Sequence, residues 1–278
     1  RRLRILKCEV SMQAACLRGD LEAVQALHGQ GKSLHTSPSW TLRPIHEACR
    51  GGSLPIVQYL VEHGVPVDVI QGGDPWRIDD EDLRDELFLS GWQPLHVCCR
   101  KGFLSLAKWL HAQGAPLCPA DRAWYEEAEE DDMIRPPCPV ELACKGGHLE
   151  CAKWLHAKGA RLDRIRPYHP SALHIACGQG HLACAQWLHS NGATLNRSFD
   201  GADMFPIHIA CFENRLEVVK WLHAQGVPLN FATRYKRLPI HCACLSGEVD
   251  VVQWLHSQGA ALDVASADGH TPLSLAFE

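Results

Sequence analysis

Residues 205–230 read FPIHIACFENRLEVVKWLHAQGVPLN, a pattern that indicates two short helices joined by a turn. Pro206 suits the first turn of a helix, where its missing N–H is not needed, and Asn214 tolerates the left-handed conformation that ends one. A second stretch of helical periodicity begins at Leu216 and terminates at Gly226. Two helices of about nine residues cannot bury their apolar faces alone, so the pattern requires a stacked copy on each side.

Such copies are present along the whole chain. The segment Trp-Leu-His begins at Trp109, Trp154, Trp187, Trp221 and Trp254, and a pair ending in cysteine recurs at Cys16, Cys49, Cys99, Cys144, Cys177, Cys211 and Cys244. The cysteines are 33, 50, 45, 33, 34 and 33 residues apart, and the block-ending glycines repeat the same series. The two long gaps are therefore insertions of 17 and 12 residues into an otherwise regular array.

Length, charge and hydropathy exclude some classes of function. A net charge of −5 over 278 residues gives no general attraction to nucleic acid or anionic membrane. No window of 18 apolar residues predicts a membrane span, and no signal-peptide core follows the basic residues at the N-terminus. The absent initiating Met and the incomplete last repeat favour a fragment of a longer protein.

The fourteen cysteines fit packing better than disulfide bonding. Seven of them occupy one repeat position, where a small apolar side chain is wanted between closely packed helices. Reduced cysteine behaves as a small hydrophobe. This interpretation favours a reducing compartment inside the cell.

The repeat resembles that of the ankyrin family, whose signature is Thr-Pro-Leu-His followed by an Ala-Ala pair. The copies of this signature are Arg43-Pro44-Ile45-His46 with Ala48-Cys49, Gln93-Pro94-Leu95-His96 with Cys98-Cys99, Ser171-Ala172-Leu173-His174 with Ala176-Cys177, Pro206-Ile207-His208 with Ala210-Cys211, and Leu238-Pro239-Ile240-His241 with Ala243-Cys244. The resemblance implies an all-α ankyrin-repeat solenoid of stacked helix-turn-helix pairs, with a hairpin finger before each pair. The first unit lacks the Pro and His, and Glu141 replaces the histidine in the fourth.

This resemblance sets the expected boundaries. Residues 1–9 form a basic N-terminal flank, and the array occupies residues 10–278. Repeats are expected near 10–34, 40–68, 92–117, 138–163, 171–196, 205–230 and 238–263, with a partial repeat at 267–278 and acidic finger insertions at 69–91 and 118–137.

Recurring histidines raise the question of metal binding. In five first helices a histidine precedes a cysteine by three residues, as in His208 and Cys211, which places both on one helical face. A metal site is normally built once, whereas this pair recurs with the fold, so we expect no metal site and no cofactor. The second-helix histidines, exemplified by His223, are expected to lie partly exposed beside the tryptophans, which themselves are expected to pack in the core.

Catalytic patterns are missing from the sequence. It contains no Gly-x-Ser-x-Gly elbow, no phosphate-cradling glycine-rich loop and no His-Glu-x-x-His run. We therefore expect no catalytic residues in the repeats and predict that the chain is not an enzyme.

The insertions carry the residues that the repeat template does not explain. Residues 69–91 and 118–137 each have a net charge of −5, which leaves about +5 on the rest of the chain. Aromatic side chains lie among the carboxylates, as anchors of a binding surface do. The candidate partner-binding residues are Trp76, Asp79, Asp80, Glu81, Asp82, Trp124, Tyr125, Glu126, Glu127, Glu129 and Glu130. Solvated loops with no partner are the competing interpretation, and the run at 79–82 lacks the glycine and ligand alternation of a calcium loop.

Together these features predict a non-catalytic scaffold or adaptor that binds another protein through its fingers, its concave surface and its acidic insertions. The partner is expected to present a basic segment, and the array to be monomeric and cytoplasmic, with no nucleic-acid or membrane binding and with a nuclear location left open. Two alternatives stand. The array is the targeting arm of a larger enzyme or receptor, or the chain is a metal-binding or redox-sensing protein that uses its cysteines and histidines.

Overall fold

The computed structural model describes residues 11–35, 43–69, 92–117, 137–162, 169–199, 203–247 and 249–277. Within these ranges the named elements are all helices, and the strand pairing is limited to one antiparallel bridge between Phe199 and Met204. None of the helices in the described ranges has both the length and the apolar character needed to cross a membrane.

The helices come in pairs, a first helix of seven or eight residues and a second helix of nine. Their bounds are α1 (Met12–Arg18) with α2 (Leu21–Gly29), α3 (Pro44–Arg50) with α4 (Leu54–Glu62), α6 (Pro94–Lys101) with α7 (Leu104–Ala112), α8 (Pro139–Lys145) with α9 (Leu149–Ala157), α10 (Ala172–Gln179) with α11 (Leu182–Ser190), α12 (Pro206–Phe212) with α13 (Leu216–Ala224), and α14 (Pro239–Leu245) with α15 (Val249–Ser257). A single short helix, α16 (Pro272–Leu275), follows the last pair.

Local sequence explains where these helices begin and end. Most first helices start at a proline, which needs no hydrogen-bond acceptor at that position. Asn214 has a φ of 53° between α12 and α13, and Gly226 has a φ of 87° two residues after the end of α13. Asn214 therefore has the left-handed backbone predicted from the sequence, and the second helix ends near Gly226 as predicted, with a left-handed backbone at that glycine.

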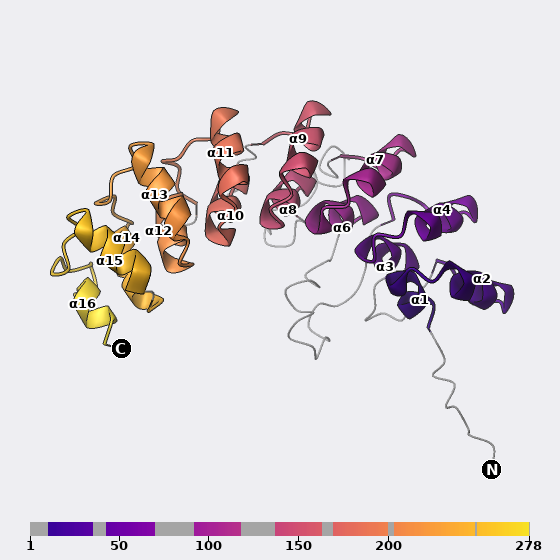
Figure 1. Ribbon diagram of the computed structural model, residues 1–278, viewed down its shortest axis with the longest axis horizontal. Coiled ribbons are helices and arrows are strands. Elements are labelled where there is room, and N and C mark those ends of the chain that lie inside the picture. The colour runs from indigo at the N-terminus through magenta and orange to yellow at the C-terminus, as the bar shows by residue number, and fades with distance from the viewer. Residues whose placement is uncertain are drawn as a thin grey trace, which may run out of the picture. The chain divides into compact units, whose positions relative to one another are not determined.

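The chain consists of two compact units, residues Arg1–Pro139 and Val140–Glu278. In the first unit α1 packs on α3 and α3 on α6, while α2 packs on α4. In the second unit α10, α12, α14 and α16 pack in sequence, and so do the neighbouring second helices α9 with α11 and α13 with α15. Each unit therefore has a row of first helices on one side and a row of second helices on the other (Figure 1).

The core repeats with the helices. The leucine of each Trp-Leu-His segment is fully buried, as are the apolar residue before the first-helix histidine and the Ala-Cys pair after it. In the pair α12 and α13 these residues are Leu222, Ile207, Ala210 and Cys211. Burying one such leucine or isoleucine contributes about 1.5–3 kcal/mol, so stacking supplies stability that no single pair has.

Candidate functional site

The predicted partner-binding residues lie outside the described residues. Trp76, Asp79, Asp80, Glu81 and Asp82 fall in 70–91, and Trp124, Tyr125, Glu126, Glu127, Glu129 and Glu130 fall in 118–136. Their role in binding a partner stays a prediction, and the site geometry comes from the helices and the described fingers.

Four first-helix histidines, His46, His174, His208 and His241, bond the backbone of the segment that leads to the next repeat. Nε2 of His174 donates to the carbonyl oxygen of Arg197 at 2.9 Å, and Nε2 of His241 donates to that of Val264 at 3.0 Å. His46 reaches across the first insertion to the carbonyl oxygen of Trp92 at 3.0 Å. Arg197 and Val264 each lie at the start of a finger, and Trp92 lies two residues before α6. These bonds therefore join a first helix to the segment that leads to the next repeat, and the histidines stabilise the fold.

The same histidines are held neutral. Burial lowers the pKa of His46 to about 4 and that of His96 to about 3, because the charged imidazolium loses its hydration. Burial likewise lowers the pKa of His208 to about 4, against the opposing effect of its hydrogen bond to the Arg237 carbonyl. Neutral imidazoles that each bond a backbone group through one ring nitrogen suit a structural role.

Metal binding finds no support in the described ranges, which contain no group of three or more His, Cys, Asp or Glu side chains placed to hold an ion. The cysteines there are buried free thiols. Burial raises the pKa of Cys16 and of Cys242 to about 12, so both remain protonated at neutral pH. Cys184 differs, because a hydrogen bond from the Cys144 thiol lowers its pKa.

Second-helix histidines and tryptophans form a ladder along the other row. His156, His189 and His223 each meet the tryptophan of the following repeat edge to face, with ring centroids 5.7–6.0 Å apart. His189 also donates from Nδ1 to the carbonyl oxygen of Ala193 at 3.1 Å. The prediction that these histidines are at least partly exposed is confirmed. The tryptophans were predicted to pack in the core, but they are half-buried.

Two neighbouring fingers of the second unit are ordered by specific bonds. The finger between α13 and α14 closes through the Thr233 N–H, which donates to the Arg237 carbonyl oxygen at 2.9 Å, and Lys236 there has a φ of 55°. The Ala267 N–H of the next finger donates to the Tyr235 carbonyl oxygen at 2.8 Å. An ion pair of 2.8 Å between Arg237 and Asp268 adds a second connection.

Sequence periodicity missed the large apolar side chains that the repeat leaves in solvent. Phe212 is 47% exposed, Leu245 39% and Tyr235 53%. Phe212 and Leu245 occupy the post-cysteine position, the residue directly after the repeated cysteine of a first helix. In chain order this position holds Leu17, Arg50, Arg100, Lys145, Gly178, Phe212 and Leu245. Its variability among otherwise similar repeats is the signal that marks a surface site.

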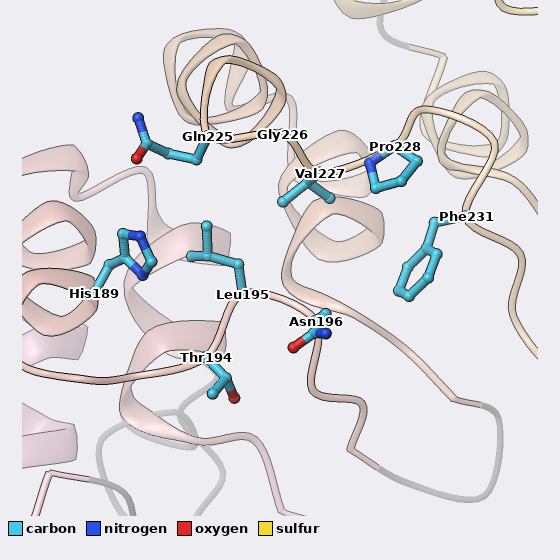
Figure 2. A pocket seen from close by; sticks show the side chains of 9 residues that line it. All are labelled: His189, Thr194, Leu195, Asn196, Gln225, Gly226, Val227, Pro228 and Phe231. Atoms are coloured by element: carbon cyan, nitrogen blue, oxygen red, sulfur yellow. The ribbon is translucent and has the colours of Figure 1, made fainter.

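A hollow of about 460 Å³ opens between the loops that follow α11 and α13. Figure 2 shows Leu195 and Val227 on facing loops, with His189 on one side and Phe231 on the other. Exposed polar groups of Thr194, Asn196 and Gln225 complete its lining together with Gly226 and Pro228. Its volume lies in the range of small-ligand pockets, and its lining contains no Asp, Glu, Lys or Arg.

Stacked helix pairs joined by fingers define a helical repeat solenoid, and comparison with known proteins identifies the kind. A family model for ankyrin repeats in three copies matches residues 11–121 and 207–278, and a model for ankyrin repeats in many copies matches 140–189 and 173–223. The chain belongs to the ankyrin-repeat family. Arrays of this family generally bind other proteins and are typically non-catalytic.

A solved structure supports the same assignment. The human ASB11 ankyrin repeat domain is similar to this chain with a TM-score of 0.63 and 25% sequence identity, over 84% of this chain and 91% of that domain. A comparison with curated protein sequences gives no significant match.

Proposed function

We propose that this chain is a non-catalytic adaptor that binds a partner protein through its fingers, its row of first helices and its acidic insertions. The observation that carries the proposal is that the repeated polar and aromatic side chains make contacts within the fold, whereas large side chains at a variable position are exposed. Its histidines bond backbone carbonyl groups, and its tryptophans pack on neighbouring rings. At the variable post-cysteine position, Phe212 and Leu245 are exposed to solvent, and the targets of such scaffolds are set by surface residues.

The acidic insertions provide the finer part of the proposal. Their charge of −5 each is concentrated in two segments, and aromatic residues among the carboxylates supply anchors. A basic segment of the partner would be attracted by the carboxylates, with Trp76 and Trp124 as its apolar contacts. The cysteines packed in the helices support a second part of the proposal, a reducing location inside the cell, in the first place the cytoplasm.

The test is affinity capture from cell lysate with three forms of the chain. The first is wild type, and the second has Asp79, Asp80, Glu81 and Asp82 changed to Asn or Gln. The third is a matched control, Glu217→Gln with Asp250→Asn, which removes acidic groups that are exposed on second helices. We expect partners of the wild type to be lost from the second form and kept by the control, with a larger difference at 50 mM than at 300 mM salt.

Equal recovery of the same proteins by all three forms, at both salt concentrations, would remove the insertion at 69–91 from the binding surface. Deletion of both 69–91 and 118–137 then extends the test to the whole acidic surface. A deleted chain that still captured every partner would exclude a role for the insertions.

A further inference from the structure

Two neighbouring repeats of the second unit have exposed apolar side chains at the post-cysteine position. Phe212 ends α12 with 47% of its surface exposed, and Leu245 ends α14 with 39% exposed. Arg50 and Arg100 occupy the same position in α3 and α6. Since the fold accepts a charged residue here, packing of the repeat does not require Phe212 or Leu245 to be apolar.

The spacing of these two side chains fits a helix. The first helices α12 and α14 pack directly on each other, and packed helices have axes about 8–10 Å apart. In an α-helix two residues seven positions apart lie on one face and about 10.5 Å apart along the axis. A partner helix that crosses α12 and α14 would therefore place two such residues beside Phe212 and Leu245.

The charge near this surface is positive on the side of the finger. The finger between α13 and α14 exposes Arg234 and Lys236 beside Tyr235, while Arg237 pairs with Asp268. This finger precedes the seven-residue helix α14, and Leu245 is the last residue of that helix. The finger and Leu245 are therefore separated by the length of α14, about 10 Å. That length equals the width of one helix with its side chains, about 10–12 Å.

We propose that the second unit binds an amphipathic helix of a partner protein, with two large apolar side chains seven residues apart over Phe212 and Leu245. One flank of that helix carries carboxylates that face Arg234 and Lys236. The opposite flank carries no acidic cluster, because Glu213 is exposed at the end of α12 and like charges repel. The inference deepens the proposed adaptor function and rests on it, but it concerns a different surface from the acidic insertions.

The test uses a phage-displayed library of 16-residue peptides, selected on the whole chain at 50 mM salt. The most enriched peptide is then synthesised, and its helicity and its Kd are measured by circular dichroism and fluorescence anisotropy. We expect an acidic peptide that becomes helical on binding and has apolar residues at i and i+7. The double variant Phe212→Arg with Leu245→Arg should weaken its binding at least tenfold, and it should fold because arginine occupies this position in α3 and α6.

Two further variants separate this surface from its alternatives. Arg234→Glu with Lys236→Glu should weaken the same peptide by about tenfold at 50 mM salt and by less at 500 mM, because salt screens exposed charges. Leu17→Arg makes the equivalent change in the first unit, where Leu17 is 37% exposed, and should leave Kd unchanged within twofold.

Each contrary result overturns the inference. These results are a library with no enriched sequence, basic or non-helical peptides, or binding that survives the Phe212 and Leu245 changes. A fourth is sedimentation showing that the free chain dimerises through these residues, which would make a second copy the occupant. A peptide lost only on deletion of 69–91 and 118–137 would leave the adaptor function standing and remove this surface from it.

Discussion

Lowering the pH from 7.5 to 5.5 is expected to destabilise the array through its buried first-helix histidines. His46, His96 and His208 have pKa values of about 4, about 3 and about 4 in the folded chain. In the unfolded chain a histidine titrates near 6.5. Between these values the unfolded chain binds protons that the folded chain does not, so folding stability is full above pH 6.5 and falls as the pH drops toward 4.

The size of the effect follows from the same values. At pH 5.5 about nine-tenths of the unfolded histidines are protonated, against a few per cent of the folded ones, which costs about 1.3 kcal/mol for each histidine relative to pH 7.5. The three histidines together would cost about 4 kcal/mol. This is a large share of the stability of an ordinary domain, about 5–15 kcal/mol.

Urea unfolding followed by tryptophan fluorescence, at pH 7.5 and at pH 5.5, measures this difference. We expect a clearly lower midpoint at pH 5.5. The variant His208→Gln should be less stable than wild type at pH 7.5, because the bond to the Arg237 carbonyl is weakened, and should lose about 1.3 kcal/mol less between the two pH values. His256→Gln, which changes an exposed ring on α15, is the matched control and should keep the full difference.

Two results would refute this reasoning. One is an unfolding midpoint at pH 5.5 equal to or higher than that at pH 7.5. The other is a His208→Gln variant that shows the wild-type loss in full, which would assign the acid sensitivity to other groups.

Further predictions concern the core, the turns and the thiols. Leu222→Ala should lower the free energy of unfolding by about 2–5 kcal/mol, because this side chain is fully buried; a loss under 1 kcal/mol in urea unfolding would contradict the assigned packing. Gly226→Ala should cost about 1–2 kcal/mol from left-handed strain alone, since φ is 87° and no atom lies within 4 Å of the added methyl group; unchanged stability would contradict it. Cys16 and Cys242, whose pKa values are raised to about 12, should react with a thiol reagent at pH 7.5 only after urea unfolding, as mass spectrometry of the labelled peptides would show. Rapid labelling of the folded chain would refute their burial.

The helices were predictable because their signals are local. Pro206 begins α12, Asn214 has the expected left-handed backbone, and α13 ends near Gly226 as expected. The expected length of about nine residues is correct for α13, whereas α12 has seven residues. These features depend on backbone preferences of single residues, which the sequence states directly. The repeat period then implied the stacking, because each pair needs a neighbour to cover its apolar face.

Exposure of individual side chains was harder to predict. Periodicity marks Phe212 as one more apolar residue of a short helix, but 47% of its surface is exposed to solvent. The tryptophans were expected in the core, yet Trp221 is half-buried with its ring against the edge of His189. Both outcomes depend on contacts with other repeats, which helical period alone does not specify. The acidic insertions remain a prediction from charge.

The hydrogen bond from a first-helix histidine to a later carbonyl group, made by His46 and His174, has a consequence for how such a chain changes over time. His174 bonds Arg197, which is 23 residues later and before the Phe199–Met204 bridge, at 2.9 Å. His46 bonds Trp92, which is 46 residues later and two residues before α6, at 3.0 Å. A histidine at this position can therefore bond the backbone on either side of a finger, and the insertion of 17 residues leaves the helix that carries His46 bonded to the start of the next repeat. Loop length and scaffold integrity are decoupled at the first insertion, so new recognition segments can be placed there at little cost to folding.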